Sequence, residues 1–284
     1  MFKIALVVGG TNTKCALFKG NRIVKKLERS TGARKGTKFM ISNILDMISE
    51  VKGSSKISGI GLGSPGRVNS KTGVVVKYSK FKWKNLPLAR IVQKKFKTKV
   101  IMENDANCAG LGALKNTKTK NFVLLTLGTG LGGAVVIEGE LYKGMGSAGH
   151  FGHSTIEKNG FRCTCGNRGC LEEYVAARAF ERLARKYFGK KLSPKEIERL
   201  AVRNKKAKKI YNEIGRYLGI GLANIANAFN PEIIYFTGKI IRSGSLLLGP
   251  ARDEMRKRIV VKPPKLKRAP EDSGLYGAVS LLNL

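Results

Sequence analysis

The residues with the clearest chemistry lie between positions 153 and 172. One histidine and three cysteines occur there among glycines: His153, Cys163, Cys165 and Cys170. Zinc prefers four nitrogen and sulfur donors in a tetrahedron, and a glycine-rich loop lets donors that are close in sequence surround one ion. The spacing is tighter than in common zinc fingers, which indicates a metal knuckle inside a larger domain. The alternative is a group of buried or redox-active thiols.

Two polar residues flank this loop. His150 precedes it and Glu172 follows it, and the chain contains only 2 histidines, both in this region. A bound ion would hold the two side chains at a fixed separation, and both can form hydrogen bonds with sugar hydroxyls. We therefore expect the loop to contribute to a binding site.

A candidate base stands in the segment Asn104-Asp105-Ala106-Asn107, between an apolar stretch and a helical pattern. The simplest interpretation is that Asp105 caps the helix. In a cleft facing phosphate-binding turns, the same carboxylate would take the proton from a hydroxyl group that attacks a γ-phosphoryl group. The sequence leaves both roles open.

Two glycine turns share one plan, in which an apolar strand, a Gly/Thr turn and a second apolar strand follow one another. The turns are residues 9–14 and 128–133, and both segments predict β-hairpins. Glycine lets backbone N–H groups approach phosphate oxygens, although each turn alone is also an ordinary hairpin. Neither is a P-loop. Their separation predicts two similarly built lobes.

The elements that must position these residues alternate between strand and helix patterns, which indicates an α/β protein. A tight loop over Ser64–Val68 follows one strand, and it is either a plain surface turn or a place where the backbone approaches a small polar ligand. The expected strands are 57–62, 100–103 and 233–236, and the expected helices are 40–51, 88–96, 171–188, 210–229 and 274–282.

Composition narrows the class of protein. The chain has 284 residues, enough for two lobes, and 5 cysteines, of which only Cys15 and Cys108 lie outside the loop, so a disulfide framework is not expected. The N-terminal apolar run is too short to span a membrane and has no cleavage site, so we expect a cytoplasmic protein.

The net charge of +35 attracts polyanions. The basic residues are spread along the chain without a recognisable nucleic-acid module. We interpret them as solvated helix faces with incidental polyanion affinity, and polyphosphate is an alternative phosphoryl donor.

Taken in order, these motifs resemble those of the ROK family of sugar kinases and repressors, within the actin-like ATPase superfamily. The resemblance covers essentially the full length, and no repressor-type helix-turn-helix precedes the first strand, which favours the kinase branch. It rests on Gly9-Gly10-Thr11-Asn12, Ser64-Pro65-Gly66-Arg67-Val68, Asn104-Asp105-Ala106-Asn107, Gly128-Thr129-Gly130-x-Gly132-Gly133, Gly152-His153, Cys163-x-Cys165-Gly166-x2-Gly169-Cys170-Leu171-Glu172 and Gly277-Ala278.

The resemblance implies a two-lobed actin-like ATPase fold (ribonuclease H-like, α/β) with a zinc-binding loop and the nucleotide between the lobes. The expected N-terminal lobe is residues 1–115 plus 271–284, and the expected C-terminal lobe is 116–270. The implied activity is ATP- and Mg²⁺-dependent phosphorylation of a hexose or N-acetylhexosamine, at O6. The resemblance also implies a homo-oligomer, because members of this family are often dimers or tetramers.

The same resemblance implies the site residues. Asp105 resembles the family's catalytic base in its position, and His153 would bind both zinc and the sugar. The sugar contacts it implies are Gly66, Arg67, Ser79, Asn104, His153 and Glu172, with His150 beside them. The residues that would face the nucleotide are Gly10, Thr11, Asn12, Lys14, Thr129, Gly130 and Gly238.

Three positions depart from the family pattern. The family has an Asp that helps to hold Mg²⁺ where this chain has Val7, and a Glu where it has His150. The third is milder, because Thr237-Gly238 stands in place of Gly-Gly. Loss of the carboxylate removes an anchor for the metal, so an alternative is a sugar- or nucleotide-binding protein with impaired kinase activity. Histidine can donate as well as accept, so His150 should alter sugar preference.

Overall fold

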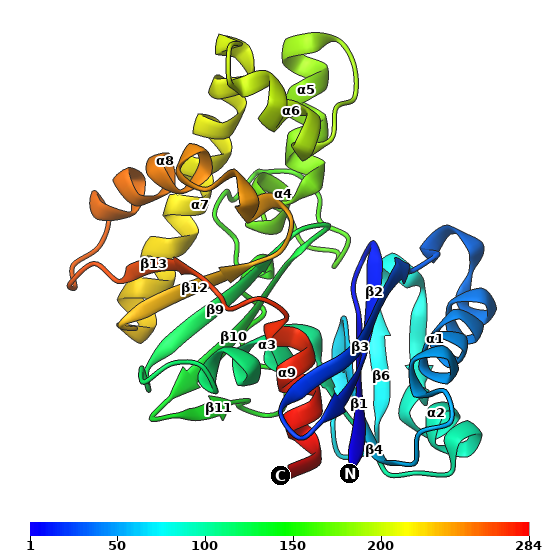
Figure 1. The fold of residues 1–284 in the computed structure, drawn as a ribbon. Coiled ribbons are helices and arrows are strands. Elements are labelled where there is room, and N and C mark those ends of the chain that lie inside the picture. The colour runs from blue at the N-terminus through cyan, green and yellow to red at the C-terminus, as the bar shows by residue number, and fades with distance from the viewer. Residues whose placement is uncertain (284) are drawn as a thin grey trace. The chain divides into compact units, whose positions relative to one another are not determined.

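A computed structural model describes residues 1–283. The chain divides into two compact units, which are drawn in Figure 1. Unit 1 contains residues 1–120, 134–148 and 270–284, and unit 2 contains residues 121–133 and 149–269. Among the described residues, no helix combines the length and the apolar character that crossing a bilayer requires.

A five-stranded mixed sheet organises unit 1, in the order β3-β2-β1-β4-β8. The central strand β1 pairs antiparallel with β2 and parallel with β4, and β4 pairs parallel with β8. The strands are β1 (Phe2–Val8), β2 (Asn12–Lys19), β3 (Arg22–Ser30), β4 (Ile57–Ser64) and β8 (Val100–Asn104).

Strand alternation gives the sheet two apolar faces. Ile4 and Leu6 pack with α1 (Thr37–Lys52) and α2 (Leu88–Phe96). Ala5 lies in the opposite cluster, with α3 (Asp105–Leu114) and α9 (Ser273–Ser280). The predicted helices at 40–51 and 88–96 are confirmed, and the predicted C-terminal helix corresponds to α9 followed by the 3₁₀ turn η5 (Leu281–Asn283).

Helices α3 and α9 cross with their backbones in contact. A Cβ atom built at Gly277 would lie 1.6 Å from the carbonyl oxygen of Cys108, and one at Gly112 would lie 1.8 Å from that of Ser273. Only glycine permits such an approach, because any side chain would push the helices apart.

Gly277→Ala is therefore expected to destabilise the protein by about 3 kcal/mol, since the new methyl group meets backbone that cannot rotate away. Gly249→Ala is the matched control, because Gly249 also lies in a helix but has no atom within 4 Å of the added Cβ. The control should be neutral or stabilise the fold by up to about 1 kcal/mol. Urea unfolding of the two variants measures the difference, and equal midpoints would contradict the packing argument.

A small antiparallel sheet in unit 1 has no counterpart in the sequence-based expectations. Its order is β5-β6-β7, and the 3₁₀ turn η2 (Ser79–Phe81) connects the last two strands. The strands are β5 (Arg67–Asn69), β6 (Val74–Tyr78) and β7 (Trp83–Leu86). This sheet positions two predicted site residues, because Arg67 lies on β5 and Ser79 directly follows the last residue of β6.

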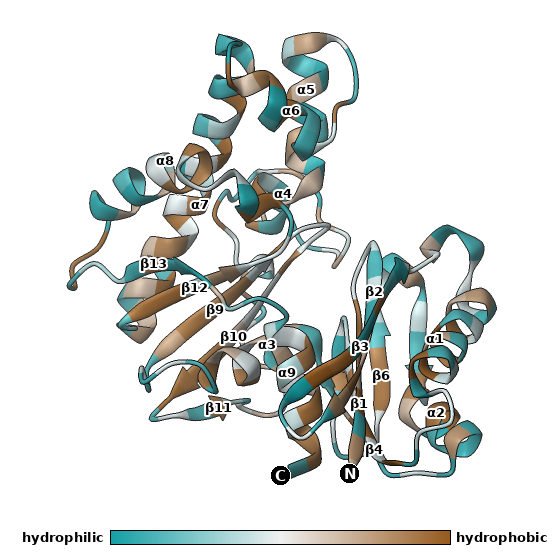
Figure 2. Cartoon of the chain, in the orientation of Figure 1, coloured by the Kyte–Doolittle hydropathy of each residue, from teal (hydrophilic) through white to brown (hydrophobic). Residues whose placement is uncertain are grey.

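The second five-stranded sheet has the order β11-β10-β9-β12-β13. Numbered along the chain, both large sheets follow the pattern 3-2-1-4-5, which confirms the expected repetition of one plan. Figure 2 shows hydrophobic residues concentrated along β9 and β12. The strands are β9 (Phe122–Leu127), β10 (Leu131–Ile137), β11 (Glu140–Tyr142), β12 (Ile233–Thr237) and β13 (Lys265–Arg268).

The predicted helix at 171–188 is wrong as a single element. It is two helices, because Ala176 is extended (ψ 179°) and the amide of Ala177 donates to the carbonyl of Gly128 at 3.0 Å. The remaining helical elements are α4 (Glu172–Val175), α5 (Ala177–Phe188), α6 (Pro194–Ala201), α7 (Lys205–Phe229) and α8 (Ser245–Arg256), with short 3₁₀ turns η1 (Ala33–Lys35), η3 (Phe151–His153) and η4 (Ile240–Ser243).

Candidate functional site

The start of α3 presents Asp105. The cap of this helix is Asn104, whose Oδ1 accepts hydrogen bonds from the amides of Ala106 at 2.9 Å and Asn107 at 3.2 Å. The simplest interpretation of Asp105, as the cap, is therefore wrong, and the carboxylate is not needed to begin the helix. The Nδ2 group of Asn104 donates to the carbonyl of Gly66 at 3.0 Å, so one amide ties the glycine loop to the helix start.

Sequence reasoning missed the group that supports this arrangement. Glu103 is 1% exposed, and its carboxylate accepts from the amide of Asn104 at 2.8 Å, from Ser70 Oγ at 2.8 Å and from Asn107 Nδ2 at 3.1 Å. Lys143 forms an ion pair with it at 3.1 Å. A buried carboxylate needs such partners. The available signal was an acidic residue in an apolar strand directly before Asn-Asp.

Partial burial changes the acidity of Asp105. Burial raises the pKa of the Asp105 carboxyl to about 6, although the hydrogen bond from the Ala106 amide and the charge of Lys80 oppose the shift. A carboxylate with this pKa is largely ionised at neutral pH, yet basic enough to accept a proton from a reacting hydroxyl group.

The raised pKa also predicts a stability effect. The folded state favours the protonated form of Asp105, so this residue costs stability as the pH rises from about 4 through 6. Asp105→Asn should therefore stabilise the protein by about 1–3 kcal/mol at pH 8 and by nothing at pH 3.5. Denaturant unfolding at the two pH values tests this, and equal stability of the variant and the wild type at pH 8 would contradict it.

The other predicted sugar contacts in unit 1 are placed as follows. Gly66 has φ +88°, and a Cβ there would lie 2.6 Å from the carbonyl oxygen of Lys77, so this position requires glycine. Arg67 and Ser79 are exposed, on β5 and at the start of η2. The structure thus joins Gly66 to Asn104 and leaves Arg67 and Ser79 at the surface.

The first glycine turn is shorter than expected. The residues between β1 and β2 are 9–11, and the amide of Gly9 donates to the carbonyl of Asn12 at 3.0 Å. Lys14 lies within β2, directly opposite Val7 on β1, and not in the turn as the sequence predicted. Opposed residues of antiparallel strands project from the same face, so Lys14 and Val7 share the face that α9 covers.

The second glycine turn, at residues 128–130, connects β9 to β10. Gly128 donates its amide to the carbonyl of Gly130 at 3.0 Å, and the amide of Leu131 donates to Glu172 Oε2 at 2.8 Å. Gly238 also lies at this end of the sheet, because a Cβ built there would be 2.1 Å from the carbonyl oxygen of Leu127. The turn and Gly238 are therefore neighbours in unit 2.

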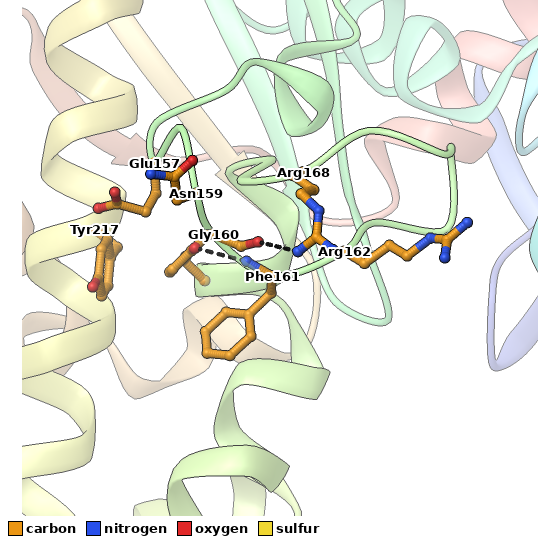
Figure 3. A pocket seen from close by; sticks show the side chains of 8 residues that line it. Glu157, Asn159, Gly160, Phe161, Arg162, Arg168 and Tyr217 are labelled. Carbon is orange, nitrogen blue, oxygen red and sulfur yellow. Dashed lines mark hydrogen bonds between the residues drawn. The ribbon is translucent and has the colours of Figure 1, made fainter.

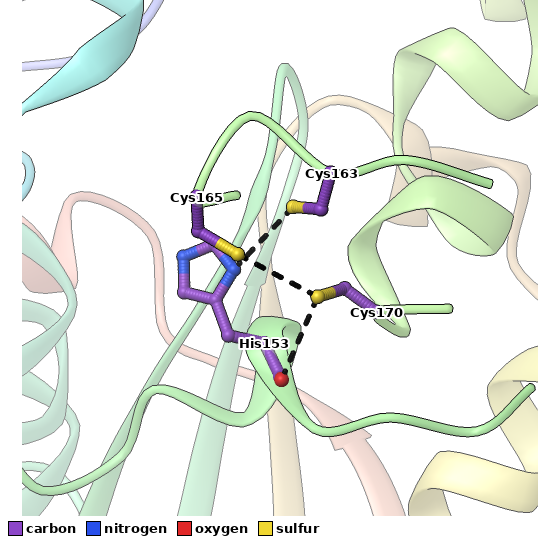
Figure 4. A group of neighbouring side chains, drawn as sticks. All are labelled: His153, Cys163, Cys165 and Cys170. Atoms are coloured by element: carbon purple, nitrogen blue, oxygen red, sulfur yellow. Dashed lines mark hydrogen bonds between the residues drawn. The ribbon is translucent and has the colours of Figure 1, made fainter. Parts of the chain in front are cut away.

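Figure 4 shows the four predicted metal ligands converging. His153 Nδ1 lies 3.7 Å from Cys163 Sγ, and Cys165 Sγ lies 3.7 Å from Cys170 Sγ. All four donor atoms lie within 4.8 Å of one another. Zinc–sulfur bonds of about 2.3 Å at tetrahedral angles place two sulfurs about 3.8 Å apart, so this donor set fits zinc.

The three thiols of this cluster affect one another's acidity. Burial, together with the thiols of Cys163 and Cys165, raises the pKa of Cys170 above its usual value, which favours the protonated thiol when no cation is bound. Metals bind the thiolate form, and a divalent cation would offset the repulsion between three adjacent thiolates. Inert buried thiols do not account for Cys165, which is exposed and points at the other donors, whereas redox-active thiols remain an alternative to a metal.

Glu172 connects the metal cluster to the second glycine turn. Its side chain is buried, and its carboxylate lies within 4.8 Å of Cys163 Sγ while accepting the Leu131 amide. His150 is exposed, and its ring centroid is 6.2 Å from that of His153. Unit 2 thus brings together the four metal ligands, Glu172 and the glycine turn.

An open hollow of about 510 Å³ lies beside the metal loop (Figure 3). None of the predicted site residues lines it. The hydrogen bond from the Phe161 amide to the Tyr174 hydroxyl oxygen, at 3.1 Å, and the stacking of Arg182 on the Phe161 ring anchor the outer part of the metal loop to α4 and α5. We interpret the hollow as the outer surface of that anchor.

The fold and these site features define a two-sheet α/β protein of the actin-like ATPase type. A family model described as "ROK family" matches residues 3–283. The chain is 33% identical to the glucokinase of Thermotoga maritima, covering 98% of this chain and 96% of the relative. The chain belongs to the ROK family, as the sequence motifs predicted.

Two further comparisons show the range of the family. A crystal structure of a ROK family glucokinase from Streptomyces griseus, in complex with glucose and AMPPNP, has a TM-score of 0.88 and 26% identity, covering 99% of both chains. The xylose repressor of Bacillus subtilis is 36% identical, over 71% of this chain and 53% of the repressor. Enzymes and repressors therefore both occur among the relatives.

Proposed function

We propose that this protein is an ATP-dependent sugar kinase that transfers a phosphoryl group to a hexose or N-acetylhexosamine. The observation that carries the proposal is Asp105: a half-buried carboxylate at the first residue of α3, not used as a cap, with a pKa raised to about 6. The similarity to enzymes named glucokinase supports the reaction class.

The proposed reaction is phosphorylation at O6. Asp105 would take the proton of the substrate hydroxyl as its oxygen attacks the γ-phosphorus of ATP, and ADP would leave with the β–γ bridging oxygen. Asn104 would donate its second N–H to the sugar, beside Gly66 and the exposed side chains of Arg67 and Ser79. Each of these residues belongs to unit 1.

The proposed sugar contacts of unit 2 are His150, His153 and Glu172. Because Nδ1 of His153 faces the cysteines, its Nε2 is the nitrogen that would meet the sugar. Zinc, when bound, would supply rigidity to this loop, through His153 and the three cysteines. The glycine turn, through Thr129 and Gly130, together with Gly238, is proposed to face the nucleotide.

Position 7 does not fit a magnesium ligand. The methyl groups of Val7 would lie 3.2 and 3.3 Å from a Cβ built at Gly63, and 3.6 and 3.7 Å from a Cβ built at Gly274 on α9. Methyl groups cannot coordinate Mg²⁺, which requires oxygen ligands. No step of the proposed reaction is therefore assigned to a metal held at position 7.

A coupled assay for ADP release, over glucose, mannose, N-acetylglucosamine and N-acetylmannosamine, tests the proposal. We expect turnover with at least one sugar in the presence of ATP. Absence of turnover above the level of an Asp105→Asn control, with every sugar, would reject the kinase.

A second candidate is a sugar- or nucleotide-binding protein without kinase activity, and Val7 is the observation that favours it. Calorimetry showing sugar binding without turnover, together with no gain of activity in Val7→Asp, would support this candidate. Robust turnover by the wild type would exclude it.

The phosphoryl donor is tested separately. The net charge of +35 would attract polyphosphate as well as ATP. Competition between ATP and polyphosphate at several salt concentrations decides between the two donors. A polyphosphate site should weaken steeply as salt rises, since each phosphate contact releases counterions.

A further inference from the structure

An aspartate at the start of α9 has an unusual backbone. Asp272 has φ +53° and ψ +20°, the left-handed region, which a residue with a side chain occupies at a cost. It occupies the N-cap position, where aspartate ordinarily accepts a hydrogen bond from a helix amide. Its side chain makes no such capping bond. The protein thus accepts a strained residue and gives up a cap.

The carboxylate is used elsewhere. Oδ1 of Asp272 forms an ion pair with Lys14 Nζ at 3.0 Å, and Oδ2 forms one with Lys26 Nζ at 2.6 Å. The aspartate side chain is 8% exposed, and the lysine side chains are 38% and 41% exposed. Burial opposes ionisation, but the hydrogen bonds from Lys26 and Lys14 lower the pKa of Asp272 below its usual value.

The sheet register places this pair beside the first glycine turn. Lys14 is opposite Val7, and Lys26 is opposite Ala16, so both ammonium groups project from the face that α9 covers. Gly274, two residues after Asp272, lies against the Val7 methyl groups. Val7 offers no oxygen ligand, and next to it the ion pair with Asp272 holds the ammonium group of Lys14 in a fixed direction.

We propose that Asp272 is a positioning residue that orients Lys14 toward the phosphates of the nucleotide at the first glycine turn, so that an ammonium group supplies the charge that Val7 cannot anchor through a metal. The inference rests on the proposed function, since it takes the nucleotide as the ligand. Lys14 has three N–H donors, and its bond to Asp272 uses one of them, which leaves two directions for phosphate oxygens.

The test compares single and double variants of the full chain. Asp272→Asn keeps a residue that tolerates the left-handed backbone and removes the charge that holds Lys14. The affinity for a non-hydrolysable ATP analogue, and KM for ATP, should each weaken about 10-fold, equivalent to roughly 1.4 kcal/mol, with KM for sugar within twofold. Lys14→Met should weaken nucleotide affinity at least as much.

Asp272→Asn should cause no further loss when combined with Lys14→Met, because the aspartate acts through that lysine. Glu271→Gln is the matched control, because it removes an adjacent exposed carboxylate, and it should leave both affinities within twofold. Additive losses in the double variant, or unchanged analogue binding in Asp272→Asn or Lys14→Met, would overturn the inference, as would failure of the wild type to bind the analogue.

Analogue binding is measured without turnover, so the two proposals can fail separately. A wild type that phosphorylates no sugar, but whose nucleotide binding depends on Asp272 through Lys14, would reject the kinase and retain the positioning role. An active kinase whose nucleotide affinity does not change in Asp272→Asn would retain the kinase proposal and reject the positioning role.

Discussion

Asp105→Asn is expected to lower kcat by about 10²- to 10⁴-fold, the range typical of a lost general base, while KM for sugar changes little. The amide keeps the shape of the carboxylate and still accepts the Ala106 hydrogen bond through its oxygen, so the start of α3 should survive. What it loses is the ability to remove a proton. Steady-state kinetics of the purified variant on its best sugar measure the effect.

The pH profile provides a second measure of the same role. In the wild type, kcat should fall tenfold per pH unit below about pH 6, because the Asp105 carboxyl becomes protonated there. Asp105→Asn should retain no such acid limb in its residual activity. A variant with wild-type kcat, or an acid limb that persists unchanged in it, would assign the base to another residue.

Removal of zinc is expected to abolish sugar binding. Structural zinc contributes about 10–16 kcal/mol in small zinc-finger peptides, far more than any single contact of this loop, so its loss should release residues 153–170 from their observed conformation. Glu172 and His153 would then lose their positions, since both lie at the cluster. Metal analysis and sugar calorimetry before and after chelation measure the two losses.

Cys165→Ala should reproduce the effect of chelation without added reagents. Cys15→Ala is its control, because Cys15 is a buried thiol on β2, outside the cluster. The control should retain one zinc per chain and lose about 1 kcal/mol of stability from the smaller side chain. Full sugar affinity in a sample shown to be free of metal would refute the role assigned to zinc.

The Cys/His cluster and the glycine turns were predictable because their chemistry is local. Cys163, Cys165 and Cys170 are close enough in the chain for spacing to restrict the ion they bind. Each hairpin likewise joins neighbouring strands, so its apolar segments and glycines identify it without knowledge of the rest of the fold.

The support of Asp105 was less predictable, because it depends on residues distant in sequence. Glu103 is held by Ser70 and Lys143, and Asn104 reaches Gly66. Periodicity also failed at Ala176, because a bond from the next residue to Gly128, far along the chain, outweighs local helix preference there.

The sequence alone indicated the family and the repeated α/β plan and predicted a zinc ligand set, since each depends on residue types at short or characteristic spacings. Tertiary structure decided that Asn104 and not Asp105 caps α3, that Glu103 is buried with partners, and that Asp105 is half-buried with a raised pKa. It also decided that Lys14 lies on a strand and is held by Asp272, 258 residues away. Burial and long-range pairing arise only when distant segments pack together, and those two effects determine the acidity and direction of charged groups.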